Sequence, residues 1–101
     1  MNIFENNQVP DLGSESFSTL FQNSNLKIQH IISNSFENGK WYDQEDTEWV
    51  ILLKGKAIIE FETDKKRLIA GDYLLIKAHQ RHRVVSTSDD AHWIALHVSS
   101  T

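Results

Sequence analysis

Hydrophobic and polar residues alternate along much of this chain, and the clearest example is residues 48–55. The segment reads Glu-Trp-Val-Ile-Leu-Leu-Lys-Gly, a run of large and β-branched residues closed by glycine. Such a run predicts a buried strand that ends in a turn. Because side chains alternate between the two faces of a strand, Glu48 is expected to share one face with Val50 and Leu52. A carboxylate on an apolar face is costly to bury alone, so Glu48 needs a cation, an imidazole or a water-filled cavity beside it.

Further short strands follow the same pattern from residue 26 onward, with a turn about every 8–12 residues. This regular spacing predicts an all-β sandwich or barrel built around one hydrophobic core. The predicted strands are residues 26–32, 48–53, 56–62, 67–70, 73–76, 83–86 and 92–98. The residues expected to face the interior are Val50, Leu52, Ile59, Leu75, Val84 and Ala95.

The first 25 residues differ from the rest of the chain because they are rich in Asn and Ser. We interpret residues 1–25 as a short N-terminal arm that packs on the barrel, and residues 26–101 as the barrel itself. Within the arm, Ser14 is expected to cap a short helical turn. The apolar residues on one side of that turn, expected to cover the core rather than to bind a partner helix, are Phe17, Leu20 and Phe21.

The composition narrows the class of protein further. A chain of 101 residues with 40% hydrophobic and 24% charged residues suits one folded domain. The net charge of −4 and the scattered Lys and Arg residues argue against a nucleic-acid partner. No run approaches the ~18 apolar residues of a membrane span, and no secretory signal is evident, so we expect no membrane partner and a cytoplasmic location. Without cysteine, disulfides and thiolate metal ligands are excluded.

Two segments with a glycine at one end carry the strongest motif signal. Glu48 and Gly55 are separated by six residues, and Gly71 and His82 are separated by ten. These residues and spacings resemble the two motifs of the cupin superfamily, in particular small single-domain bacterial cupins whose first metal motif is degenerate. The resemblance covers residues 26–98. It implies a cupin-type jelly roll, a conical β-barrel that commonly holds a divalent metal ion.

The departures from the family pattern bear on the expected metal site. Where family members usually carry two histidines before the motif glutamate, this chain has Tyr42 and Gln44. The resemblance therefore implies Glu48 and His82 as metal ligands, with Gln44 as a weaker oxygen donor. The other departures, which replace the motif proline, glycine and asparagine, are Lys77, His79 and Ser86. Zinc, iron, manganese and nickel all remain admissible for such nitrogen and oxygen donors, and binding is expected to be weak or absent.

Each candidate site residue also has a simpler interpretation. Glu48 can pair with His82 or Arg83 inside the barrel mouth without any metal. His79 falls in a predicted turn, where a histidine commonly faces solvent. A strand histidine such as His97 is commonly a hydrogen-bonded core residue. The residues that we expect in or near a pocket beside the metal ligands are Tyr42, His79, Ser86 and His97.

Two classes of function are compatible with this pattern. One is a metal-dependent oxygenase, isomerase or lyase that acts on a small organic molecule. The other is a non-catalytic binding or sensory module that holds a small organic ligand in the barrel, and fold alone does not separate the two. We also expect a homodimer, because Trp49, Ile51 and Leu53 make the strand apolar on the face opposite Glu48 as well.

Overall fold

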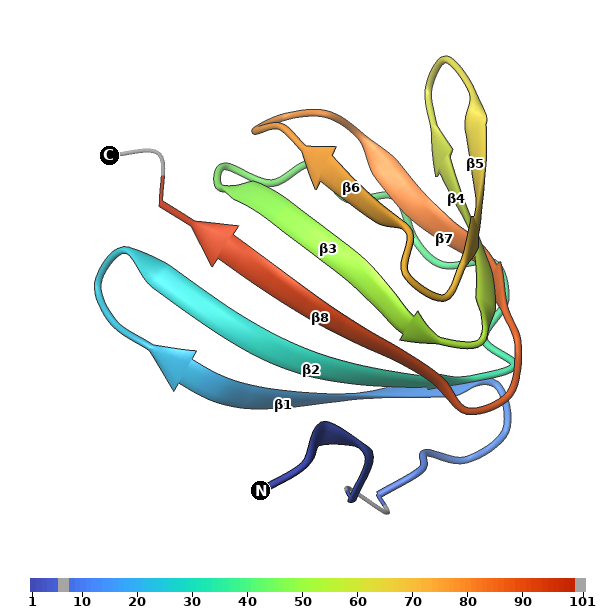
Figure 1. Ribbon diagram of the computed structural model, residues 1–101. Helices are drawn as coiled ribbons and strands as arrows, with labels where there is room; N and C mark the ends of the chain where they lie inside the picture. The colour runs from blue at the N-terminus through green and yellow to red at the C-terminus, as the bar shows by residue number, and fades with distance from the viewer. Residues whose placement is uncertain (6–7, 100–101) are drawn as a thin grey trace.

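The computed structural model describes residues 1–5 and 8–99, and it is built from two antiparallel β-sheets (Figure 1). The elements are η1 (Ile3–Glu5), β1 (Ser14–Gln22), β2 (Leu26–Asn34), β3 (Thr47–Lys54), β4 (Lys56–Phe61), β5 (Lys65–Ile69), β6 (Tyr73–Ile76), β7 (His82–Thr87) and β8 (Ala91–Val98). The larger sheet has the order β1-β2-β8-β3-β6, and the smaller sheet has the order β5-β4-β7. The all-β jelly roll expected from the sequence is confirmed.

The core lies between the two sheets, where every second residue of the central strands points inward. On β3, Val50 and Leu52 are 4% and 0% exposed, while Ile51 between them is only half-buried. On β8, Trp93 and Ala95 are 3% and 0% exposed. The predicted interior positions Val50, Leu52, Ile59 and Ala95 are confirmed, and half-buried Val84 packs against the same core.

The prediction for Leu75 is wrong, because its side chain is 57% exposed. In the pairing of β3 with β6, Leu75 lies opposite Trp49 and Ile76 lies opposite Glu48. Directly paired residues share a face, so Leu75 joins Trp49 on the outer surface and Ile76 fills the core. All four residues of β6 are apolar or aromatic, so its sequence alone did not reveal which two point inward.

The predicted helical turn after Ser14 is also wrong, because residues 14–22 form β1, an edge strand paired with β2. Without a neighbour, one edge of β2 would leave a row of unpaired backbone groups, and β1 satisfies them along its length. Part of the predicted arm therefore belongs to the larger sheet. The apolar residues expected to cover the core are instead about half-exposed, namely Phe17, Leu20 and Phe21.

The segment before β1 contributes to the outer side of the larger sheet. Its single turn of 3-10 helix, η1, places the ring of Phe4 edge-on against His92 of β8, with 5.5 Å between ring centroids. Among the residues that the structure describes, no helix has the length and apolar character required to cross a membrane.

The outer face of β3 and β6 carries the predicted homodimer contact. Trp49 and Tyr73 lie together there with their ring centroids 5.6 Å apart, and Tyr73 and Leu75 are 64% and 57% exposed. The homodimer stays a prediction. We expect sedimentation at micromolar concentration to give a species twice the chain mass of 11.7 kDa, because a second copy would remove this apolar surface from water.

Two charged substitutions test this association, one in the predicted contact and one outside it as a control. Leu75→Lys should shift the sedimenting species toward the monomer. Ile69→Lys, at a position that is 60% exposed on β5 of the other sheet, should leave it unchanged. A wild-type protein that sediments only as an 11.7 kDa monomer would contradict the prediction.

Candidate functional site

Glu48 stands at the head of β3 and is buried, with 8% of its surface exposed. The side-chain amide of Gln44 donates a hydrogen bond of 3.1 Å to Oε1 of Glu48. Nε2 of His82 lies 3.7 Å from the same oxygen, and Nε2 of His97 lies 4.0 Å from Oε2. Both histidine distances are too long for a direct hydrogen bond. The carboxylate therefore faces two imidazoles across gaps that an additional atom could fill.

Strand pairing explains why these groups converge. Glu48 is paired directly with His97 of the neighbouring strand β8, so both side chains point to the interior face of the larger sheet. His82 begins β7 in the opposite sheet. The backbone of Tyr42 exchanges two hydrogen bonds with that of His82, at 2.8 and 3.1 Å, which fixes the segment before β3 against β7.

The orientation of the His82 ring determines what it offers to the site. Its Nδ1 lies 3.0 Å from the carbonyl oxygen of Gln80. A carbonyl only accepts, so Nδ1 carries the hydrogen, and in the neutral ring Nε2 presents a lone pair toward Glu48. The ring also stacks on Tyr42, with 5.8 Å between centroids. Two acceptors that face each other favour a proton donor or a cation between them.

The site opens into a cavity of about 180 Å³ between the two sheets. Its apolar wall comes from both sheets. Polar side chains lie around Glu48, and two further polar residues, Glu15 and Gln29, are contributed by β1 and β2. The lining residues are Glu15, Phe17, Gln29, Ile31, Tyr42, Gln44, Glu48, Val50, Ile59, Ile76, His82, Val84, Trp93 and His97. A mostly apolar cavity with a few convergent polar groups is the usual architecture of a small-molecule site.

Glu15 is a charged pocket residue that the sequence did not predict. Ser33 of β2 donates a hydrogen bond to its Oε2 at 2.5 Å, and the indole nitrogen of Trp93 donates to the Ser33 hydroxyl at 3.1 Å. Burial raises the pKa of Glu15, and the Ser33 hydrogen bond opposes that shift. Burial also raises the pKa of Tyr42, with smaller contributions from the charges of Glu15 and Glu48. The alternation of Glu15 and Phe17 with serines was the available signal for a strand with one face inward.

The predicted pocket residues divide into two groups. Tyr42 and His97 line the cavity. His79 and Ser86 do not: His79 lies in a turn with a positive φ of 61°, exposed, with Nδ1 2.7 Å from a carboxylate oxygen of Asp43. Ser86 lies on β7 and pairs with Ile58 of β4.

The structure also shows which charged side chains lie beside Glu48 and His97. Arg83 is not a partner of Glu48, because its Nε bonds Glu60 at 2.7 Å. His97 has a second carboxylate beside it, with Nδ1 3.2 Å from Oδ2 of Asp46. His97 therefore lies between two carboxylates, one at each ring nitrogen.

The donor set fits a divalent metal ion only in part. Glu48 and His82 leave a gap of 3.7 Å that could accommodate an ion bonded at ~2.1 Å to each. Gln44, however, directs its amide nitrogen at Glu48 and uses it as a hydrogen-bond donor. Across residues 1–5 and 8–99, no three His, Cys, Asp or Glu side chains are placed to hold one ion. These residues do not make a complete metal site, and the predicted metal-ligand roles stay predictions.

Comparisons with known proteins bear on the family and the fold. A family model described as "Cupin domain" matches residues 32–98. A "putative mannose-6-phosphate isomerase" from Ralstonia eutropha is similar over 99% of this chain and 97% of its own, with 37% identity and a TM-score of 0.87. KdgF from a Halomonas species is similar over 86% of this chain and 80% of its own, with 19% identity and a TM-score of 0.78. An RmlC-like cupin from Shewanella frigidimarina is similar over 95% of this chain and 86% of its own, with 18% identity and a TM-score of 0.79. A search of curated proteins found no match.

Proposed function

Given that this chain belongs to the cupin family, we propose that it binds a small polar organic molecule in the cavity between its two sheets. The observation that carries the proposal is the buried pair of Glu48 and His82, which face each other at 3.7 Å without a direct hydrogen bond. A ligand hydroxyl placed between them can donate to one group and complete the geometry that the free protein leaves open. The apolar wall of the cavity supplies contact area for the rest of the molecule.

The same pair could also support catalysis. Isomerisation of a sugar moves a proton between neighbouring carbon atoms, which needs an acid or base within hydrogen-bond reach. Glu48 and His82 are groups of that kind, and the isomerase name of the Ralstonia protein makes sugars the first substrates to try. A binding or sensory module without turnover would hold the same ligand unchanged. Product analysis after incubation with a bound sugar separates these two functions.

Ligand binding is expected to depend on Glu48. Glu48→Gln keeps the size of the side chain but removes its charge, and it should weaken binding of an accepted sugar by about 10-fold or more. The measurement is the dissociation constant from calorimetry, together with the ligand-induced shift in Tm. Glu62→Gln, at an exposed position with the same change in net charge, is the matched control. Equal affinities for wild type and Glu48→Gln would contradict the proposed site.

A divalent cation bound by Glu48 and His82 is a second candidate, favoured by the lone pair that Nε2 of His82 directs toward the carboxylate. When bound, such an ion would polarise a ligand oxygen. This candidate predicts that zinc, manganese or nickel binds at micromolar concentration. Affinity should fall in acid, because a protonated imidazole has no lone pair for a metal.

The metal candidate is tested by titrating all three ions at two pH values. His82→Ala and Glu48→Gln should each weaken binding, and exposed His79→Ala should not. If the variants and wild type bind equally, or if wild type does not bind at micromolar metal, the cation is not held by this pair. The cavity would then be a purely organic ligand site.

A further inference from the structure

We propose that Glu15 is a ligand-contacting residue that makes the cavity selective for charge, favouring a protonated amine over a phosphate or carboxylate. This inference rests on the proposed function, because it concerns the same cavity. It adds a ligand class: small hydroxylated molecules that carry an amino group.

The position of Glu15 supports direct contact with a ligand. It lines the cavity from β1, and Ser33 occupies only its Oε2. Within the described part of the chain, every fully buried side-chain nitrogen or oxygen has a hydrogen-bond partner, and no partner of Oε1 is found among those residues. Oε1 is therefore accessible, and it remains available as an acceptor for a ligand donor.

The charges around the cavity set the preference. Glu48 has Gln44, His82 and His97 beside it, whereas no ion pair to Glu15 is found among residues 1–5 and 8–99. The described residues that line the cavity include two carboxylates and no Lys or Arg. Burial raises the pKa of Glu15, as expected for a carboxylate without a compensating cation. An arriving ammonium group would supply that compensation, and an arriving phosphate would add a third negative group.

Aromatic residues strengthen the preference for a cation. Phe17, Tyr42 and Trp93 line the same cavity as Glu15. Organic cations are attracted to the faces of aromatic rings, most strongly when water is excluded. Lys40 lies outside this lining. It borders an adjacent hollow of about 390 Å³, which Glu15, Phe17 and Tyr42 also line, and its Nζ is 5.3 Å from the centroid of the Tyr42 ring.

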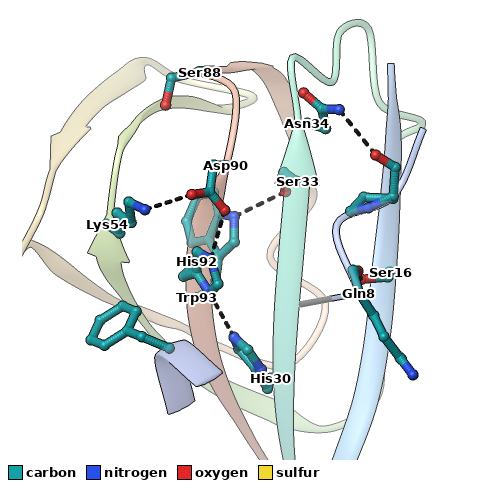
Figure 2. Close-up of polar contacts among 12 residues, drawn as sticks. Gln8, Ser16, His30, Ser33, Asn34, Lys54, Ser88, Asp90, His92 and Trp93 are labelled. Atoms are coloured by element: carbon teal, nitrogen blue, oxygen red, sulfur yellow. Dashed lines mark hydrogen bonds and ion pairs between the residues drawn. The ribbon is translucent and has the colours of Figure 1, made fainter. Parts of the chain in front are cut away.

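Trp93 provides a built-in reporter for the experiment, because its indole N–H donates to Ser33, which in turn donates to Glu15 (Figure 2 shows the first of these bonds). We would follow the indole N–H resonance of Trp93 in the full chain while titrating glucosamine, glucose and glucose 6-phosphate. Wild type should bind glucosamine most tightly, on the order of tenfold more tightly than glucose 6-phosphate. In Glu15→Gln this ratio should fall several-fold, because the amide keeps the hydrogen bond to Ser33 but carries no charge.

Variants distinguish failure of this inference from failure of the proposed function. Glu15→Asp keeps the charge, so it should keep the preference for the amine. Glu62→Gln should behave like wild type, although it changes net charge as Glu15→Gln does. If Glu15→Gln keeps the wild-type ratio of affinities for glucosamine and glucose 6-phosphate while Glu48→Gln abolishes binding, the cavity binds ligands and the role of Glu15 is wrong.

Two further outcomes would overturn the proposed role of Glu15. Tightest binding of glucose 6-phosphate, lost in Lys40→Ala, would place the phosphate in the outer hollow and overturn the charge preference. If none of the three probes shifts the Trp93 resonance at millimolar concentration, both the proposed function and the role of Glu15 fail.

Discussion

Gly55→Ala is expected to lower the free energy of unfolding by about 3 kcal/mol or more, because two penalties coincide at this position. Gly55 connects β3 to β4 with a φ of +90°, a conformation that residues with a Cβ rarely adopt. A Cβ there would lie 2.5 Å from Oγ of Ser88 and 3.1 Å from Cα of Ala91. Ser88 Oγ accepts a hydrogen bond from the backbone of Lys56, so moving it away would break a second contact.

Gly71 provides a matched control for that substitution. It has a similar φ of +97°, but no atom lies within 4 Å of the position that a Cβ would occupy. Gly71→Ala should therefore show the backbone penalty alone, about 1–2 kcal/mol. Urea denaturation of the three proteins measures the difference. Equal losses in both variants would show that the contacts of Gly55 with Ser88 and Ala91 do not limit the fold.

The second large effect is expected at a series of polar contacts that runs from the exposed Lys54–Asp90 ion pair to the buried ring of His30 (Figure 2). Nζ of Lys54 contacts one carboxylate oxygen of Asp90, and the other oxygen lies 2.8 Å from Nε2 of His92. Nδ1 of His92 lies 2.9 Å from Nε2 of His30. A carboxylate only accepts, so His92 donates through Nε2, and in its neutral form it accepts at Nδ1 from His30.

His92→Ala should lower the free energy of unfolding by about 2–4 kcal/mol. His30 and His92 are 1% and 3% exposed, so the substitution leaves a cavity and removes the His92 partner of a buried imidazole. It also removes the ring on which Phe4 packs. Urea denaturation measures this loss, with exposed His79→Ala as the control. A loss no greater than that of the control would show that the contacts of His92 add little to stability.

The same series of polar contacts predicts a loss of stability in acid. Burial, followed by the neighbouring His92, lowers the pKa of His30 below its ordinary value of 6.5. Between 6.5 and that lowered pKa the unfolded chain binds a proton that the folded chain does not, so stability falls as the pH falls. Stability is therefore expected to be lower at pH 5.5 than at pH 7.5, which urea denaturation at the two pH values would measure. His30→Gln can still donate to His92 but does not titrate, so it should flatten this part of the pH profile.

Much of the fold could be predicted from local pattern. Alternation and turn spacing predicted the strands from β2 to β8. Both signals are local, because the two-residue alternation of a strand and the residues of a turn lie within short stretches of sequence. The inward face of β3 followed from the same alternation, and so did the need of Glu48 for a polar partner. The motif spacing brought Glu48 and His82 into one site, and the structure places them 3.7 Å apart.

The features that could not be predicted all depend on pairing between distant segments. Whether Leu75 points inward depends on its register with Trp49, and β6 on its own has no polar residue to mark its outer face. Residues 14–22 form a strand because β2 offers them a free edge, and only that pairing brings Glu15 into the cavity. His30 and His92 meet although they are 62 positions apart.

The glycines show most directly what the sequence predicts and what only the tertiary structure determines. Gly39, Gly55 and Gly71 recur at intervals of sixteen residues, a spacing that is typical of successive turns. Their roles differ because different parts of the chain pack against them. A Cβ at Gly39 would lie 2.7 Å from the carbonyl of Val84 and one at Gly55 would press on Ala91, while Gly71 faces open space. Conformational preference belongs to the residue and its neighbours in sequence, whereas close approach is set by strands that meet only in the folded protein.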